Sequence, residues 1–79
     1  MVNGQQIRAA RALLCWDQRE LAGRAGISIN SLSAFEDQSR RPIQRVRDAV
    51  VDALQAAGIR FVVSDEEIGV FLKRQTPED

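Results

Sequence analysis

Most of the chain consists of four short blocks of apolar residues with helical spacing, and this pattern limits the possible folds more than any other feature. In the first block, about residues 4–14, Ile7, Ala10 and Leu14 recur at i, i+3 and i+7 and therefore share one helix face. Asn3 stands directly before the block, where its side chain can accept a hydrogen bond from a free backbone N–H. The pattern predicts four amphipathic helices that bury their apolar faces against one another.

The second and third blocks are short and are separated by a glycine. Asp17 and Glu20 have the spacing of a capping box at the start of the second block. Gly26 can adopt the left-handed conformation that ends a helix in a tight turn. Ser28 is suited to cap the third block, which extends to about Asp37. Two short helices joined by a glycine turn are therefore predicted.

The third block has two distinct sides. Leu32 and Phe35 are expected to face the core, because they lie one helical turn apart on the apolar side. The remaining positions of this helix are expected to face outward: Ile29, Asn30, Ser33 and Ala34.

The fourth block follows a polar connector at residues 38–41. Pro42 is predicted to occupy the first helical turn, where its missing N–H costs little. Gly58 is the expected stop. The apolar stripe of this helix is predicted from five residues: Ile43, Val46, Val50, Leu54 and Ala57.

The pattern changes after the fourth block from helical periodicity to alternation. Residues 59–63 are predicted to form a strand with Ile59, Phe61 and Val63 on one face. An acidic turn at 64–69 and a second strand at 70–73 would complete a hairpin, followed by a loose tail at 75–79. The predicted fold is mainly α: a single domain, residues 1–79, with a four-helix helix-turn-helix core at 4–57 and a hairpin extension at 59–73.

The composition excludes several classes of protein. Among 79 residues there is one cysteine, Cys15, and there is no histidine and no tyrosine. An intrachain disulfide is therefore impossible, and neither a metal site, a cofactor nor an enzymatic residue constellation is expected. Trp16 is interpreted as a core residue, and Cys15 as a buried or half-buried small apolar residue. So small a core usually needs a partner chain, so an oligomer is expected.

No signal peptide or apolar run of membrane-spanning length is visible. A cytoplasmic protein with no membrane association is therefore predicted.

The charge is zero overall but unevenly distributed. Residues 1–47 contain eight arginines and four acidic residues, a net charge of +4, whereas residues 48–79 carry −4. Such asymmetry indicates an anionic partner at the basic end, and arginine is well matched to phosphate. An arginine-rich surface without a ligand is the alternative interpretation.

The spacing from Gln18 to Glu36 is more specific. Gln18 and Leu21-Ala22 precede Gly26-Ile27-Ser28, and Leu32 and Phe35-Glu36 follow. This pattern resembles the Cro/XRE, or lambda-repressor-like, family of helix-turn-helix transcriptional regulators over about residues 4–57. The C-terminal hairpin resembles extensions found in short bacterial members of that family. The resemblance implies a nucleoid-associated bacterial or phage protein that regulates transcription as a repressor or activator.

The resemblance also implies roles for individual residues. A partly buried salt bridge is expected between Arg11 and Glu36. The recognition helix, residues 28–36, would lie in the major groove of double-stranded DNA, with Asn30 suited to adenine and Ile29 to a thymine methyl. The base contacts implied are Ile29, Asn30, Ser33 and Ala34. The phosphate contacts implied are Gln18, Ser28, Ser31, Arg40 and Arg41.

Each of these positions also has a structural interpretation, as a solvated helix or loop residue. The sequence departs from the family pattern at Ile29, Ala34 and Asp37-Gln38, which reduces the polar and basic groups available to DNA.

A palindromic operator would require a homodimer. The hairpin, together with the fourth helix, is the predicted dimer interface, through the edge of residues 59–63. Its predicted contact residues are Ile59, Phe61, Val62, Val63 and Phe71. The alternative function is an antitoxin or anti-repressor-like module whose main partner is another protein.

Overall fold

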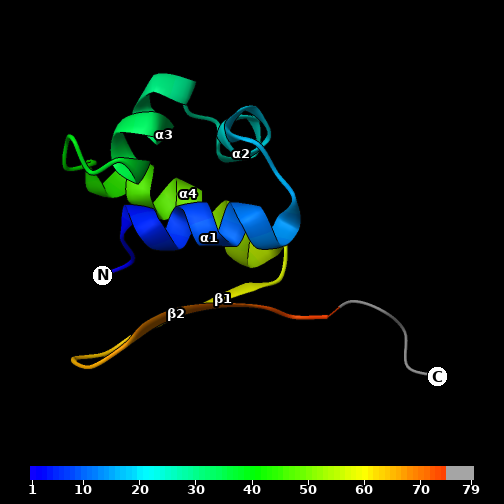
Figure 1. Cartoon of the computed structure of the whole chain (residues 1–79). Coiled ribbons are helices and arrows are strands. Elements are labelled where there is room, and N and C mark those ends of the chain that lie inside the picture. The colour runs from blue at the N-terminus through cyan, green and yellow to red at the C-terminus, as the bar shows by residue number, and fades with distance from the viewer. Residues whose placement is uncertain (75–79) are drawn as a thin grey trace.

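A computed structural model describes residues 1–74, and the predicted tail at 75–79 lies outside the described residues. The described part consists of four helices followed by a two-stranded antiparallel hairpin, which confirms the predicted fold class (Figure 1). The elements are α1 (Gly4–Leu14), α2 (Gln18–Ala25), α3 (Ile29–Glu36), α4 (Gln44–Ala56), β1 (Ile59–Val63) and β2 (Ile68–Leu72).

The first three helices each begin at a residue whose side chain caps the first turn. Asp17 accepts a hydrogen bond from the Glu20 N–H at 2.8 Å, but the Glu20 carboxylate pairs with Arg24 and does not complete the predicted capping box. The reciprocal box is found at α1, where Asn3 and Gln6 each accept from the other's backbone N–H. The starts of these three helices were thus predicted well, but which cap is reciprocal depends on competing partners.

Cys15 is exposed, so its prediction as a buried or half-buried residue was wrong. It follows the last residue of α1 in the left-handed conformation, with φ of 59°. Its backbone N–H donates to the Ala12 carbonyl, which satisfies a free group at the helix end. This turn rotates the cysteine side chain away from the apolar face of α1, whereas Trp16 packs partly buried against the core.

The start of α4 also differs from the prediction. The Ile43 carbonyl accepts the first hydrogen bonds, from Val46 and Arg47, so the helix begins at Gln44 and Pro42 precedes its first turn. Ile43 is consequently 59% exposed and does not belong to the buried stripe.

The hairpin is longer on its second strand than predicted. Ile68 pairs with Val63, and the register continues to the pair of Ile59 and Leu72. Ser64 donates to the Glu67 carbonyl at 2.8 Å, so the turn is confined to residues 64–67. The prediction placed Ile68 and Gly69 in the acidic turn, whereas both belong to β2.

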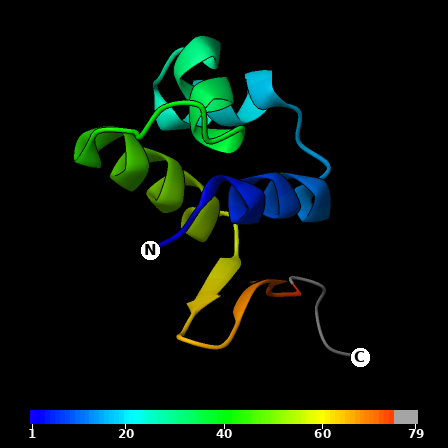
Figure 2. The ribbon, with the colours of Figure 1, turned by 60° about the vertical axis from the view of Figure 1, so that its left-hand side comes forward.

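The helices and the hairpin share a single core. α1 packs on β2 and α4 packs on β1, so the hairpin lies on the opposite side of α1 and α4 from α2 and α3 (Figures 1 and 2). The inner face of the sheet contributes Ile59, which is 3% exposed, and the partly buried Phe61, Val70 and Leu72. The other buried apolar residues are Ile7, Ala10, Leu21, Ala22, Leu32, Phe35, Val50 and Leu54.

A buried glutamine joins α1 to the hairpin. Gln6 is 2% exposed, and its Nε2 donates to the carbonyl oxygens of Val62 at 3.1 Å and Gly69 at 3.0 Å. These two residues face each other across the two strands. One amide group therefore connects the first helix to both strands, 56 and 63 residues later.

Candidate nucleic-acid interface

A left-handed glycine sets the angle between α2 and α3. Gly26 has φ of 71°, a conformation that is costly for a residue with a side chain. The next residue, Ile27, donates to the Ala22 carbonyl at 3.0 Å, and the chain then turns into α3. Ser28 caps α3 by accepting a hydrogen bond from the Ser31 N–H at 3.0 Å. The helix is thus fixed at its beginning by local geometry.

Packing divides α3 into a buried and an open side. Leu32, Phe35 and Glu36 are buried. Ile29, Asn30 and Ser31 are exposed, and Ser33 and Ala34 are half-buried. Of the residues predicted to contact bases, Ile29 and Asn30 are therefore fully accessible, and Ser33 and Ala34 are partly accessible. Ser28 and Ser31, predicted to contact phosphates, are also exposed, but their hydroxyl groups bond to each other at 3.1 Å.

A hollow lies between α3 and the connector before α4. Asn30, Ser31 and Ala34 line it from the helix, and Arg40 and Arg41 line it from the connector. The structure therefore brings Asn30 together with both predicted phosphate-binding arginines. Ile29 and Ser33 do not line this hollow.

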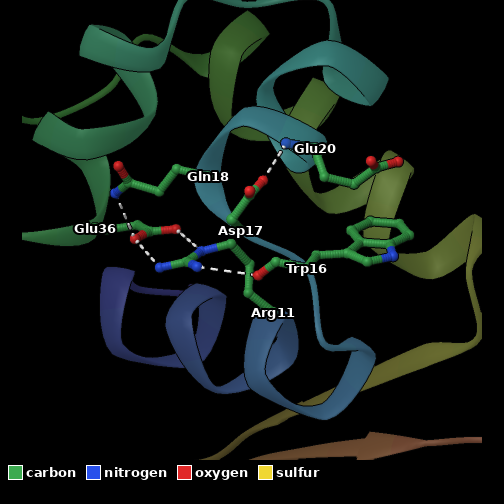
Figure 3. A network of polar contacts seen from close by, with 6 residues as sticks. All are labelled: Arg11, Trp16, Asp17, Gln18, Glu20 and Glu36. Atoms are coloured by element: carbon green, nitrogen blue, oxygen red, sulfur yellow. Dashed lines mark hydrogen bonds and ion pairs between the residues drawn. The ribbon is translucent and has the colours of Figure 1, made fainter.

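A buried carboxylate, that of Glu36, lies at the C-terminal end of α3. Glu36 is 2% exposed and accepts from Arg11 at both oxygens, from Nε at 2.7 Å and from Nη2 at 2.8 Å (Figure 3). The expected ion pair is therefore present, in the two-bond geometry that suits a planar guanidinium. Arg11 also donates to the Trp16 carbonyl at 3.2 Å, which links α1 to the loop before α2. The hydrogen bonds to Glu36 raise the pKa of Arg11, although partial burial opposes this effect.

Gln18 belongs to the same network. Its Nε2 donates to the Glu36 carboxylate at 3.0 Å, as Figure 3 shows. The side chain is half-buried, and one of its two amide hydrogens is therefore already used within the protein. A second amide hydrogen is left for a ligand. The predicted phosphate contact thus has a structural role that sequence reasoning did not anticipate.

Asp37 adds a negative charge at the end of α3. The residue is exposed, and the Ser39 N–H donates to its carboxylate at 2.9 Å. Hydrogen bonds from the side chain and the backbone of Ser39 lower the pKa of Asp37 below its usual value. The carboxylate is therefore charged at neutral pH, next to the connector that carries Arg40 and Arg41.

Arg47 is a candidate that sequence reasoning missed. It lines a second hollow together with Arg40, Arg41 and the start of the chain. Its guanidinium lies over the Phe35 ring at 5.6 Å, and its buried Nε has no hydrogen-bond partner among residues 1–74. No motif marks this arginine among its neighbours on α4. Its place beside the connector results only from the packing of α4 against α3.

The predicted dimer residues of the hairpin are divided between its two faces. Ile59 is buried in the chain's own core, and Phe61 is partly buried against it, so little of either side chain is left for the predicted dimer interface. The strand supplies one face to this core because its side chains alternate. Phe71 and Val63 remain exposed, at 52% and 44%, and Val62 is half-buried. Phe71 lies on the outer face, where the Arg60 guanidinium is 4.5 Å from its ring centre.

The described residues contain no group of three metal-ligating side chains, and none of their helices is long and apolar enough to cross a membrane. The chain matches no protein-family model, and no curated protein matches it closely enough to indicate a relationship.

Proposed function

We propose that this protein is a small DNA-binding transcriptional regulator whose α3 enters the major groove. The observation that carries the proposal is the position of the open side of α3 beside the connector with Arg40 and Arg41. A helix fits the major groove, and its side chains can reach base edges while flanking arginines hold the phosphates. Asn30 is the residue proposed to select a base.

Membership of the Cro/XRE family is part of the same proposal. It is supported by the glycine turn before α3 and by the Arg11–Glu36 ion pair, both of which match positions of the family pattern. A cytoplasmic regulator of this kind would act as a homodimer on a palindromic operator.

A second candidate is a module whose main partner is another protein. Ile29, at the start of α3, is 42% exposed, and Asp37 places a negative charge near the other end. Both features suit a protein surface better than a phosphate backbone.

The decisive experiment selects bound sites from random double-stranded DNA at two salt concentrations, because affinity for DNA has meaning only with its salt dependence. Enrichment of a palindromic sequence is expected. Asn30→Ala should lose about 5- to 100-fold of the preference for one base, as expected for loss of a paired amide–adenine contact. Gln18→Ala should weaken binding to selected and random DNA by the same factor.

Gln55→Ala is the matched control, because this exposed glutamine lies on α4 beside the hairpin. Thermal unfolding of Gln18→Ala separates a lost phosphate contact from a weakened Glu36 network. A random pool that yields no enriched sequence would refute DNA recognition, and equal losses on all sequences for Asn30→Ala would refute its role.

A further inference from the structure

One edge of the hairpin is open to another strand. The Lys73 N–H donates to the Gly58 carbonyl and the Ser64 N–H donates to the Glu67 carbonyl, both at 2.8 Å. Hydrogen-bonded pairs alternate along an antiparallel ladder, so every second residue of β2 between these points directs its backbone groups to β1. The other three residues of β2 direct their backbone N–H and C=O groups away from β1, and these groups have no backbone partner in residues 1–74. They are Ile68, Val70 and Leu72.

An apolar groove runs beside this edge. Ala9, Ala12 and Leu13 line it from α1, and Ile68 and Val70 line it from β2. Leu13 is 45% exposed and Ile68 is 48% exposed. The small alanines would allow a second helix to approach closely. An open strand edge next to exposed apolar side chains is suited to pairing with another chain.

We propose that a second copy of this chain occupies the edge, with the two β2 strands paired antiparallel about a two-fold axis at Val70. Only this register places all three outward residues opposite outward residues, because it pairs Ile68 with Leu72 of the second copy and Val70 with itself. The two hairpins then form one four-stranded sheet. The inference deepens the dimer of the proposed function.

Charge complementarity selects the second copy as the occupant. In the register centred on Val70, Glu67 stands opposite Lys73 of the other copy. These two residues directly flank β2, and both have a backbone hydrogen bond to a residue next to β1. The next residues along the chain, Glu66 and Arg74, are also of opposite charge. Each β2 is thus preceded by acids and followed by bases, so two antiparallel copies bring together opposite charges at both ends of the strand.

The edge of β1 has no such complementarity. A two-fold axis at its central residue, Phe61, would place Arg60 opposite Val62, and Gly58 opposite Ser64. The pairing edge predicted from the sequence, residues 59–63, is therefore replaced by residues 68–72 of β2.

A glycine within β2 agrees with this register. Gly69 lies inside a strand, a position where glycine weakens the sheet and often marks the close approach of another group. No contact within residues 1–74 requires it, because an added Cβ would meet only ordinary contacts, at 3.8 Å from the Phe71 ring and 3.9 Å from Val62. In the proposed dimer Gly69 stands opposite Phe71 of the second copy, so each exposed ring can cover a glycine.

The symmetry of this sheet has a consequence for α3. Antiparallel strands of one sheet are related by a two-fold axis perpendicular to it, so both copies keep their helices on the same side. Since α2 and α3 lie beyond α1 from the hairpin, both α3 helices are directed to the same side of the dimer (Figure 2). This part of the inference rests on the proposed function; the dimer itself does not.

The test reverses the charges at the ends of β2 and measures dimer dissociation by analytical ultracentrifugation without DNA. Glu67→Lys and Lys73→Glu should each raise the dimer Kd about 10-fold, because two like-charged pairs replace two opposite ones. The double variant Glu67→Lys/Lys73→Glu should return to within about 2-fold of the original value. Both residues are exposed, so their replacement leaves the core intact.

Asp52→Lys is the matched control, because it makes the same charge change on an exposed position of α4. Amide hydrogen exchange of Ile68, Val70 and Leu72 should slow as protein concentration rises, and should stay fast in Glu67→Lys. The proposal is overturned if the chain has the mass of one copy into the millimolar range, or if the double variant does not recover. A dimer with this behaviour that selects no DNA would refute only the proposed function.

Discussion

At the scale of single residues, the Glu36 carboxylate is the group whose burial most needs explanation. Moving a charge from water into a protein is costly unless charged and polar partners replace the water. Here both carboxylate oxygens accept hydrogen bonds from Arg11, and one also accepts a hydrogen bond from Gln18. Donors from α1 and α2 therefore meet at the end of α3. The same three groups hold the candidate DNA-binding helix in place.

Removing Arg11 should therefore destabilise the whole domain. Arg11→Ala leaves the Glu36 charge buried without its main partner, and a loss of about 3 kcal/mol in the free energy of unfolding is expected. Urea denaturation followed by circular dichroism measures it. Arg11→Lys keeps the charge but loses the two-bond geometry. Its free energy of unfolding should lie between those of the unchanged protein and Arg11→Ala. A change for Arg11→Ala no larger than that of Arg19→Ala, an exposed α2 control, would contradict this account.

The exposed Asp37 is expected to affect binding more than stability. Its pKa is lower in the folded chain, so the associated stabilisation is present above the unfolded pKa and is lost as the pH falls through the folded value. At neutral pH the carboxylate is therefore fully charged beside the predicted phosphate contacts. Asp37→Asn should strengthen DNA binding by about 2- to 5-fold at low salt, and less at high salt.

Fluorescence anisotropy with a selected duplex at two salt concentrations measures the effect of Asp37→Asn. Asp52→Asn makes the same change on α4 and should leave the affinity unaltered. Weaker binding by Asp37→Asn would show that the carboxylate positions the connector through its Ser39 hydrogen bond and does not repel phosphate.

At the scale of elements, Gln6 determines how the hairpin attaches to the helices. Its Oε1 accepts from the Asn3 N–H, and its Nε2 donates to one carbonyl on each strand. An isolated hairpin is marginally stable in water, so this connection and the apolar inner face are needed to hold it. Gln6 is buried, and both the oxygen and the nitrogen of its side-chain amide make hydrogen bonds.

Gln6→Glu should loosen the hairpin selectively. The glutamate keeps an oxygen for the Asn3 N–H but presents another oxygen to the Val62 and Gly69 carbonyls. A loss of about 2 kcal/mol at neutral pH is expected from the unsatisfied buried group. Hydrogen exchange should accelerate in β1 and β2 more than in α2 and α3. Gln5→Glu, exposed on the same helix, is the control, and equal acceleration in all elements would contradict a local role.

At the scale of the whole molecule, the fold separates the arginine connector from the acidic turn of the hairpin. The arginine connector and α3 lie on one side of α1, and the hairpin with its acidic turn lies on the other (Figure 1). The proposed DNA contact at α3 would therefore lie away from the acidic turn. A net charge of zero does not oppose DNA binding when the local field at the contact surface is positive.

Local chemistry accounts for what was predictable in this fold. Helix periodicity, the capping residues Asn3, Asp17 and Ser28, and the turn at Gly26 depend on neighbours within a few residues, and the four helices and the hairpin followed from them. The accessible side of α3 was predictable for the same reason, because Leu32 and Phe35 leave the opposite positions open. The pair of Arg11 and Glu36 came from the family resemblance, since no local pattern joins two residues 25 positions apart.

The sequence by itself thus determined the order of the elements, the capping residues of the first three helices and the two sides of α3, because these are set by short-range backbone and side-chain preferences. Tertiary packing alone decided that Ile59 is buried, that Gln6 reaches both strands and that Arg47 joins the connector. These outcomes depend on which distant segments compete for the same surface, and that competition is resolved only when the chain closes on its core.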